Sequence, residues 1–451
     1  MKTIFITIFE GVESKNILRT DILTILLANP EVRLVLFAKN KKRIAYFQKE
    51  FNHPRIVYEM VEKPNVAGFD WMFSKLKYVL LKSPTTDLRR RMAYGTGGSY
   101  FAYRWGFFVN RVLARPSVCR VARMLDYYLV RVRVYEDYFK QYKPNLVFLA
   151  NLFDEREVHF LREAKRQNVR TIGFINTWDR VSGRCILRLL PDDFVVFNNF
   201  VKEELIRHDD VSVSKIFVGG IPQYDQYFSL VSSSRESFFS ARGLDPATRL
   251  IVYSPIGAVF SNSDWGIIDL LEDLSKKGRF GEKVKVLVRF PPNDFIEEKE
   301  LKKRPELLYD YPGTRFSEKR GVDWDMDSGE LKHLSETLYH MSLLICYASS
   351  ISIDAVVFDK PVINIDFELG GISVLAKSPT QFYQMEHYRQ ALRTGGICLV
   401  DSIEDLVSAV KKYLDNPALD QEGRKKLVEE QCVFTDGKSG ERIGDFVLSH
   451  L

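Results

Sequence analysis

Residues 343–357 read LLICYASSISIDAVV, an apolar run that passes through small residues into a helical pattern. The first four residues predict a buried strand, and the residues from 351 onward predict a helix. Comparable apolar runs recur with helical patterns between them, at residues 3–8, 33–37, 55–58, 145–150, 170–175, 193–197, 215–218, 250–253, 284–289, 361–365 and 397–400. Strands that alternate with helices predict parallel, doubly wound α/β sheets.

The strand runs fall into two series, which predicts two domains. A chain of 451 residues with 45% apolar content is long enough to bury two separate cores. We expect two Rossmann-like domains facing each other across a cleft, with ligands at the carboxyl ends of the strands. The predicted boundaries are 1–235 for the N-terminal acceptor-side domain, with a basic helical insertion at about 72–140, 245–425 for the C-terminal donor-binding domain, and 426–451 for a helical segment that packs back on the first domain.

The net charge of +6 is unevenly distributed along the chain. Residues 72–140 contain 14 Lys and Arg against 4 Asp and Glu, a local net charge of +10, and the arginines alternate with aromatic residues and leucine. This composition predicts a basic amphipathic surface with an anionic partner, such as an anionic membrane surface. The alternative is a solvated helical face whose aromatic residues belong to the core. Because the segment matches no nucleic-acid-binding module, we expect no specific nucleic-acid partner.

Cysteine spacing and hydropathy indicate the compartment. The five cysteines are scattered without a CxxC pair, which favours reduced thiols over disulfides or a zinc site. The apolar runs are far shorter than the roughly 20 residues of a spanning helix. The first residues, MKTIFITIFEG, predict a buried strand rather than an export signal. We therefore expect a cytoplasmic protein that is peripheral at the inner face of the cell membrane.

The serine-rich turn quoted above is the first candidate for an anion site. Backbone N–H groups at a helix N-terminus bind phosphate, and the hydroxyls of Ser349, Ser350 and Ser352 add further donors. Capping of the helix is the alternative, although a cap needs only one serine. Arg289 ends a predicted strand, where its guanidinium suits bidentate bonds to phosphate or carboxylate. An ion pair at the sheet edge is the alternative for this arginine.

Two further groups lie at strand ends. Ser254 and Gly257 follow the strand 250–253, where small residues permit close approach of a ligand to the backbone. His387 opens a helical pattern near the predicted diphosphate pocket. A lone histidine is more often a core or surface residue than a catalytic one, so both interpretations of His387 stay open.

Carboxylates follow two strands of the first half. Asp154 and Glu155 come after the strand 145–150, and Asp179 comes after the strand 170–175. A carboxylate at such a position acts as general base on an acceptor hydroxyl when its pKa is suitably tuned. Solvated helix caps are the alternative.

Four familiar site types find no support in the sequence. The alternating carboxylates Asp323, Asp325 and Asp327 suggest a metal site, but Asp327 and Glu330 fit a capping box that opens a helix at 328–340, so we expect no metal. A GxGxxG followed by an acidic residue, a GxxxxGK[ST] loop and a nucleophile elbow are all missing from the sequence. We expect no bound cofactor, with a nucleotide-activated sugar serving as the donor substrate.

Several of these stretches together resemble bacterial surface-polysaccharide glycosyltransferases of the GT-B fold, a group related to CDP-glycerol glycerophosphotransferases and UDP-N-acetylglucosamine 2-epimerases. The matching stretches are NTWDRVSGR (176–184), PDDFVVFN (191–198), VGGIPQYDQYF (218–228), SSISIDAVVFDKPVINIDF (349–367), MEHYRQALRTGGICLVDSIEDLVSAVKKYLDNP (385–417) and TDGKSGERI (435–443). The resemblance implies that the three serines bind the donor diphosphate, that Arg289 belongs to the same site, and that Asp354, in place of a glutamate, faces the ribose.

The resemblance implies a metal-independent glycosyltransferase that moves a sugar from a nucleotide sugar to a glycan or lipid-linked acceptor in cell-envelope polysaccharide biosynthesis. Three alternatives stay open: a CDP-polyol phosphotransferase of the teichoic-acid type, a nucleotide-sugar 2-epimerase, and a glycan- or nucleotide-binding protein without turnover. Phe290 and two prolines replace the histidine that the phosphotransferases carry after the arginine. That difference favours the glycosyltransferase.

Overall fold

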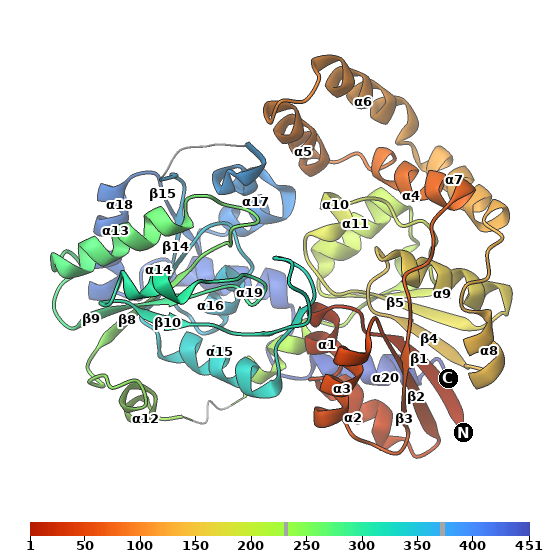
Figure 1. The fold of residues 1–451 in the computed structure, drawn as a ribbon, viewed down its shortest axis with the longest axis horizontal. Helices are drawn as coiled ribbons and strands as arrows, with labels where there is room; N and C mark the ends of the chain where they lie inside the picture. The colour runs from red at the N-terminus through yellow and green to blue at the C-terminus, as the bar shows by residue number, and fades with distance from the viewer. Residues whose placement is uncertain (230–232, 370–374) are drawn as a thin grey trace. The chain divides into compact units, whose positions relative to one another are not determined.

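The computed structural model describes residues 1–229, 233–369 and 375–451. The chain forms two compact units, each built on one parallel sheet (Figure 1). Unit 1 comprises Met1–Arg90, Ser99–Asp225 and Cys432–Leu451, and unit 2 comprises Arg91–Gly98 and Gln226–Gln431. The C-terminal residues thus belong to the same unit as the N-terminal ones.

The sheet of unit 1 has seven parallel strands in the order β3-β2-β1-β4-β5-β6-β7. Their bounds are β1 Lys2–Thr7, β2 Val32–Ala38, β3 Ile56–Met60, β4 Leu146–Leu149, β5 Arg170–Ile175, β6 Asp193–Val196 and β7 Ile216–Val218. The central strands are apolar on both faces, as a parallel sheet covered by helices on both sides requires. The predicted first strand series is therefore confirmed.

Helices connect these strands and cover the sheet. They are α1 Gly11–Ile17, α2 Asp21–Ala28, α3 Lys41–Glu50, α4 Gly68–Val79, α5 Pro84–Gly95, α6 Tyr100–Leu113, α7 Pro116–Leu129, α8 Glu136–Tyr142, α9 Glu155–Arg166, α10 Arg180–Gly183, α11 Asn199–Asp209 and α20 Ser439–Leu448, with 3-10 turns at Val213–Lys215 and Pro222–Tyr227. Helices α4 to α8 all lie between β3 and β4 in the chain. The segment predicted as a basic insertion is helical, and all of it except residues 91–98 belongs to unit 1.

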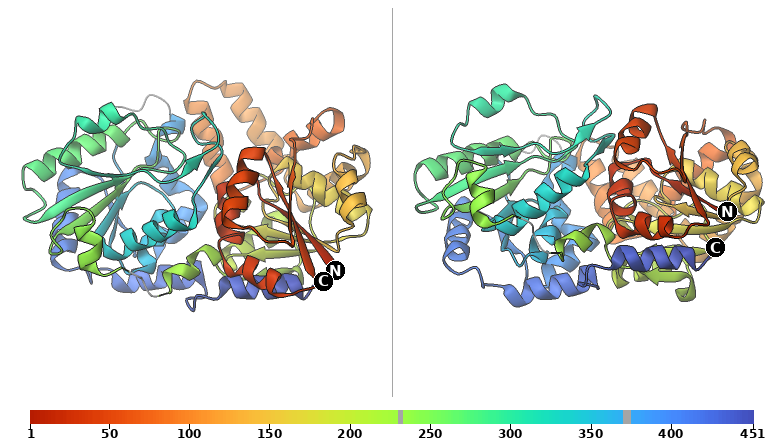
Figure 2. Two further views of the ribbon diagram at one scale, coloured as in Figure 1. Left: turned by 60° about the horizontal axis from the view of Figure 1, so that its bottom comes forward. Right: turned by 90° about the horizontal axis from the view of Figure 1, so that it is seen from below.

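Two layers of helices pack on the first sheet. Phe5, Phe37 and Val147 of the central strands share a buried cluster with Phe139 of α8 and Phe160 of α9. Helix α20 packs against α2, and the two run side by side in Figure 2. The ammonium group of Lys2 donates to the carbonyl oxygen of Leu451, so the two ends of the chain meet in unit 1.

The sheet of unit 2 has six parallel strands in the order β10-β9-β8-β13-β14-β15. Their bounds are β8 Arg249–Ser254, β9 Val284–Arg289, β10 Leu308–Asp310, β13 Leu343–Cys346, β14 Val362–Ile365 and β15 Cys398–Val400, and a separate antiparallel pair consists of β11 Thr314–Arg315 and β12 Trp324–Asp325. The sequence predicted five of the six main strands. It missed β10, whose three half-buried residues carry little apolar signal.

The helices of unit 2 are α12 Arg235–Ser240, α13 Asp264–Lys276, α14 Glu298–Lys302, α15 Ser328–His340, α16 Ile351–Val357, α17 Glu386–Arg393, α18 Ile403–Asp415 and α19 Gln421–Cys432, with 3-10 turns at Leu375–Lys377 and Pro379–Gln384. The capping box predicted for α15 is confirmed. Asp327 accepts from the N–H of Glu330 at 2.9 Å, and Glu330 accepts from the N–H of Asp327 at 3.0 Å. Within the described ranges, no helix has the length and apolar content needed to cross a membrane.

A close backbone approach fixes α19 in unit 2, and it gives a stability prediction. A Cβ atom at Gly423 would lie 2.3 Å from the carbonyl carbon of Gly395 and 2.4 Å from its oxygen. We therefore expect Gly423→Ala to lower the unfolding free energy by about 1–3 kcal/mol, measured by urea denaturation. Gly106→Ala is the matched control, because a Cβ there meets nothing within 4 Å and alanine favours the helix. Equal stability of the two variants would contradict the prediction.

Candidate functional site

The carboxyl ends of β9, β8 and β13 lie next to one another at one edge of the second sheet. The strand register pairs Ser254 with Cys346 and Tyr253 with Val288, so Arg289 and the turn after Cys346 lie at the same edge as Ser254. Open parallel sheets bind their ligands at this edge. The structure therefore brings Ser254, Arg289 and the serine-rich turn to adjacent positions in unit 2.

Arg289 is held by an ion pair and keeps one buried donor unused. The side chain is 4% exposed, and its Nη1 donates to Asp310 of the neighbouring strand β10. Asp310 also bonds to Nε2 of His333 at 2.9 Å. Burial favours the neutral form of Asp310, but these two partners outweigh it and lower the pKa of the carboxyl group. Nη2 of Arg289 is buried and has no hydrogen-bond partner among the described residues.

The three predicted serines at the turn before α16 and at its start differ in burial. Ser350 is exposed, Ser349 is half-buried, and the side chain of Ser350 makes no capping bond to the helix. Ser352 is fully buried, and its hydroxyl lies 2.9 Å from the hydroxyl of Tyr388 and 3.4 Å from Nδ2 of Asn364. Ser352 therefore anchors the turn from within, and Ser349 and Ser350 lie toward its surface.

Asn364 and Tyr388 are site neighbours that sequence reasoning missed. Oδ1 of Asn364 accepts from the Tyr388 hydroxyl at 2.6 Å, and Nδ2 of Asn364 lies 3.3 Å from the carbonyl oxygen of Cys346. This network ties β13, β14 and α17 to the start of α16. An amide inside the apolar run of β14 was the available signal. His387 precedes Tyr388 and is half-buried, so the structure places it beside this network.

Asp354 lies on α16, and its carboxylate accepts from the Tyr227 hydroxyl at 2.7 Å. Burial, followed by the charge of Asp354, raises the pKa of Tyr227 far above its ordinary value. The tyrosine hydroxyl therefore stays protonated and acts as a donor. Asp354 is half-buried and oriented by this bond.

The loop after β8 is organised by the protein's own carboxylates. Gly257 adopts a φ of +97°, and its N–H donates to Asp264 at 2.8 Å, while the N–H of Ala258 donates to Asp294 at 3.0 Å. Burial raises the pKa of Asp264 to about 6. Nζ of Lys377 lies 3.0 Å from the carbonyl oxygen of Ala258, and this cation was not identified from the sequence.

A cavity of about 230 Å³ opens beside this loop, after β8 and β9. Aromatic residues and one arginine line it together with the carboxylates of Asp264, Asp294, Glu297 and Glu300. Carboxylates at this density repel a diphosphate. We therefore do not assign an anionic ligand to this cavity.

In unit 1, two of the three predicted carboxylates are committed to ion pairs. Asp154 is the N-cap of α9 and pairs with Arg156 at 2.7 Å; burial favours its neutral form, but the bonds from Arg156 lower its pKa. Glu155 pairs with Lys77 at 2.8 Å and also with Arg188. Asp179 is half-buried and makes no side-chain capping bond at the start of α10.

A buried carboxyl pair at the carboxyl edge of the first sheet was missed by sequence reasoning. Asn151 joins the two groups: its Nδ2 donates to Glu13 at 2.8 Å and its N–H donates to Glu157 at 2.7 Å. Thr7 of β1 also donates to Glu157 at 2.7 Å, and Arg180 donates to Oδ1 of Asn151 at 2.7 Å. Loops that are far apart in the sequence supply these groups, so no short motif could identify the pair.

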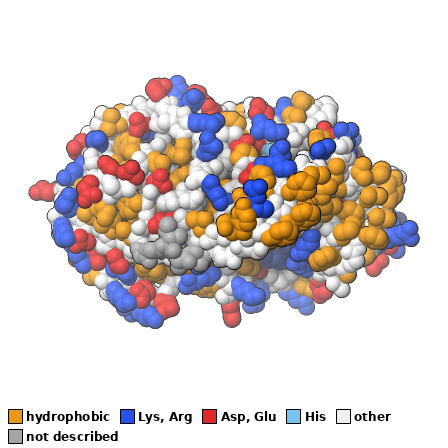
Figure 3. Space-filling model, turned by 90° about the horizontal axis from the view of Figure 1, so that it is seen from above, with side chains coloured by type: hydrophobic (Ala, Val, Ile, Leu, Met, Phe, Trp, Pro, Cys, Tyr) orange, Lys and Arg blue, Asp and Glu red, His pale blue; other side chains and the backbone are white. Residues whose placement is uncertain are grey.

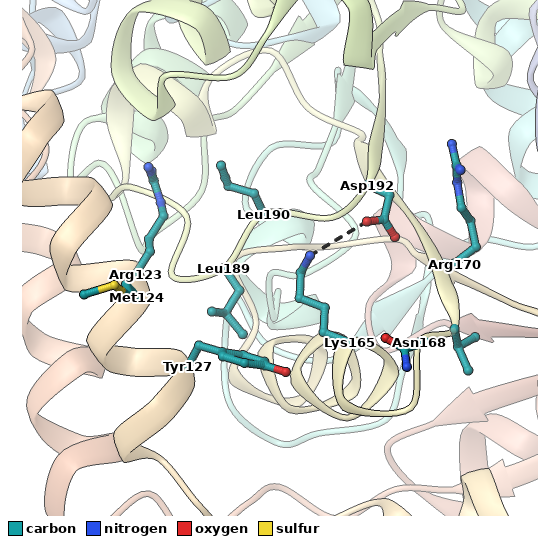
Figure 4. A pocket seen from close by; sticks show the side chains of 10 residues that line it. Arg123, Met124, Tyr127, Lys165, Asn168, Arg170, Leu189, Leu190 and Asp192 are labelled. Atoms are coloured by element: carbon teal, nitrogen blue, oxygen red, sulfur yellow. Dashed lines mark ion pairs between the residues drawn. The ribbon is translucent and has the colours of Figure 1, made fainter.

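The larger cavity of unit 1, about 660 Å³, lies elsewhere. Figure 4 shows Arg123, Tyr127 and Lys165 on its wall, with Lys165 turned toward Asp192 at 3.9 Å. Arg170, the first residue of β5, also lines it, so the cavity lies at the amino ends of the strands. Because open sheets bind ligands at the opposite ends, we do not assign a substrate to it.

Comparisons with known proteins identify the fold class. No protein-family model matches the chain, and no curated protein matches its sequence. The UDP-GlcNAc 2-epimerase from Neisseria meningitidis, bound to UDP-GlcNAc, is 10% identical at a TM-score of 0.54, with 100% of both chains covered. MnaA of S. aureus, in a co-structure with UDP, is 11% identical at 0.54, with 100% of this chain and 98% of that chain covered. The UDP-GlcNAc 2-epimerase from Methanocaldococcus jannaschii, in complex with UDP-GlcNAc and UDP, is 12% identical at 0.50, with 100% of both chains covered.

These similarities extend over the whole chain at identities that show the fold alone. Together with the two parallel sheets, they establish a GT-B-like two-domain fold. The predicted fold class is confirmed, and the predicted family resemblance is confirmed at the level of the fold.

Proposed function

We propose that unit 2 binds the diphosphate of a nucleotide-activated sugar at the carboxyl edge of its sheet. The observation that carries this proposal is Nη2 of Arg289, a buried charged donor without a partner among the described residues. An unsatisfied buried donor of this kind is costly, and a phosphate oxygen is the acceptor that a guanidinium binds best. Ser349 and Ser350 add hydroxyl donors at the neighbouring strand end.

The proposed ligand agrees with what proteins of this fold bind. The N. meningitidis structure contains UDP-GlcNAc, the S. aureus structure contains UDP, and the M. jannaschii structure contains both. In our chain, Asp354 and Tyr227 would orient the sugar part of the nucleoside, and Ser352 would hold the turn through Asn364 and Tyr388. Ser254, Gly257 and His387 border the same edge.

The proposed reaction is transfer of the sugar to a hydroxyl of a surface glycan or lipid-linked acceptor. The acceptor oxygen attacks the anomeric carbon, the bond from that carbon to the diphosphate oxygen breaks, and a carboxylate takes the acceptor proton. The nucleoside diphosphate leaves with its charge stabilised by Arg289, so the reaction as proposed requires no metal. We favour Asp179 as the base over Asp154 and Glu155, because those two are committed to ion pairs.

Nucleotide binding tests the proposal through Arg289. We expect one of UDP, GDP, CDP, CMP or dTDP to raise the melting temperature of the protein, with or without Mg²⁺, because a ligand that binds only the native state stabilises it. Arg289→Lys keeps a charge for Asp310 but lacks the second guanidinium nitrogen, so we expect the dissociation constant to rise about 10- to 100-fold. Arg279→Ala, an exposed cation of the same unit, is the control.

The outcomes separate the proposal from its alternatives. Conversion of a nucleotide sugar without any acceptor would identify a 2-epimerase, and consumption of a CDP-polyol would identify a phosphotransferase. Unchanged affinity in Arg289→Lys would remove Arg289 from the site. A melting temperature that no nucleotide shifts would favour a glycan-binding protein without turnover.

A further inference from the structure

Three helices of unit 1 carry large apolar side chains on their outer face. The side chains of Phe101, Trp105, Phe108 and Val112 on α6 recur at helical spacing and are between 42% and 75% exposed. Helices α4 and α7 contact each other and carry similar rows, and Figure 3 shows hydrophobic side chains gathered on this face with Lys and Arg side chains at their border. The apolar face, as we name it, consists of Phe69, Trp71, Met72, Tyr78, Phe101, Trp105, Phe108, Val112, Val121, Met124, Leu125 and Tyr128.

The inner face of the same helices is already occupied by a core. Leu80, Leu81, Cys119 and Ile186 form a buried cluster against which Leu113 and neighbouring residues pack. A surface helix normally turns one apolar stripe inward and a polar face outward. These helices are apolar on both sides, and an exposed apolar surface of this extent marks an interaction site.

Exposed cations surround the apolar face. Five of them have no acidic partner in the part of the chain that the structure describes: Lys75, Lys82, Arg104, Arg115 and Arg131. The tripeptide of residues 89–91, the densest basic run of the sequence, is used within the protein instead. Arg89 donates to the carbonyl oxygen of Gly183, Arg90 pairs with Asp87, and Arg91 donates to Gln384. The five unpaired cations therefore lie on α4 and α6 or on segments next to α4 and α7.

We propose that the apolar face docks unit 1 on an anionic lipid bilayer, with its aromatic side chains in the headgroup region and the unpaired cations on the lipid phosphates. Tryptophan and tyrosine suit this interface because they join an apolar ring to a polar tip. An amphipathic surface of apolar rings bordered by Arg and Lys binds anionic membranes in two ways: the rings are buried among the lipids, and the cations are attracted to the lipid phosphates. The inference rests on the surface of unit 1 alone and is independent of the proposed function.

Charge complementarity selects this partner over a second copy of the chain. Two copies meeting through the same face would bring the five unpaired cations of one copy toward those of the other. Like charges placed opposite each other oppose association, whereas an anionic bilayer neutralises them. Purely electrostatic binding to RNA would also not require these rows of exposed apolar side chains.

Vesicle flotation with the full chain tests the proposal. We expect the protein to float with vesicles of phosphatidylcholine and phosphatidylglycerol, and less with phosphatidylcholine alone. Phe101→Ser/Trp105→Ser removes two exposed rings without disturbing the core, and we expect it to weaken partitioning at least about tenfold. Arg104→Glu/Arg115→Glu should weaken binding to the anionic vesicles by a similar factor, and added salt should weaken the wild type.

Matched substitutions elsewhere control for hydrophobicity and charge. Val213→Ser/Val322→Ser removes apolar side chains that are 57% and 47% exposed outside the apolar face. Lys411→Glu/Lys425→Glu makes the same change of charge on exposed positions of unit 2. We expect both control variants to float like the wild type. Equal flotation of Phe101→Ser/Trp105→Ser and the wild type would overturn the proposal.

Further measurements test whether the rings enter the bilayer and whether the apolar face binds another partner instead. Brominated lipids should quench the tryptophan fluorescence, and Trp71→Phe/Trp105→Phe, which keeps aromatic rings on the face, should abolish most of the quenching. A concentration-dependent dimer that Phe101→Ser/Trp105→Ser disperses would overturn the proposal in favour of a second copy. Competition by RNA but not by vesicles would overturn it in favour of a nucleic acid.

Discussion

Replacing Arg188 by alanine is expected to lower the unfolding free energy by about 3–5 kcal/mol, because it leaves two buried carboxylates and one half-buried carboxylate without their shared cation. The Arg188 side chain is 1% exposed and bonds to Asp126 at 2.8 Å, to Asp70 at 2.7 Å and also to Glu155. Burial alone would raise the pKa of Asp70, but its partners His159 and Arg188 lower it to about 2. Asp70 is thus charged in the native state and depends on these two partners.

An exposed ion pair of the same unit supplies the control. Arg120 pairs with Asp210 at 2.9 Å, with side chains that are 67% and 45% exposed. Such pairs contribute about 0–1 kcal/mol, so Arg120→Ala should change the urea midpoint little. If Arg188→Ala yields no folded protein, Arg188→Lys keeps one charge and is expected to fall between the wild type and the control. A midpoint for both Arg188 variants equal to that of Arg120→Ala would contradict the prediction.

The Arg188 network shows why local patterns predicted the sheets and not the interactions between their helices. The strands at 343–346 and 284–289 have in the structure the bounds that their apolar runs predicted, because a buried parallel strand is encoded within a few residues. Asp70 lies 118 positions from Arg188 in the chain. Pairing over that separation is set by the assembled fold and leaves no short signal in the sequence.

The position of the candidate site could be predicted from the sequence, but most contacts within the site could not. The strand ends carried Arg289 and the serine-rich turn, and parallel topology brought them to one edge. The partner of Arg289 could not be predicted, because Asp310 belongs to β10, a strand too short to recognise. Ser352 looked equivalent to its neighbours, yet helical spacing turns it inward toward Tyr388.

The second large effect concerns pH and the buried carboxyl pair of Glu13 and Glu157. Burial raises the pKa of Glu13 from 4.5 to about 7. Burial, and then the charge of Glu13, raise the pKa of Glu157 above its ordinary value. The native state therefore holds protons that the unfolded chain releases above about pH 4.5, so stability falls as the pH rises from there through about 7. Each tenfold change in the acid dissociation constant corresponds to about 1.4 kcal/mol. The rise of the Glu13 pKa from 4.5 to about 7 therefore contributes about 3 kcal/mol to this loss.

Glu157→Gln tests this expectation because the amide can replace the carboxyl group in place. Its oxygen can accept from the N–H of Asn151 and its nitrogen can donate to Thr7, the two partners that Glu157 contacts at 2.7 Å. We expect the unfolding free energy of the variant, measured by urea denaturation at pH 5 and pH 8, to fall less than that of the wild type, by on the order of 1 kcal/mol or more. Glu422→Gln, at an exposed position of α19, makes the same chemical change on the surface and should keep the wild-type pH dependence. A parallel loss of stability in wild type and Glu157→Gln would mean that Glu157 is ionised throughout this range, and that the hydrogen bonds from Thr7 and Asn151 outweigh its burial.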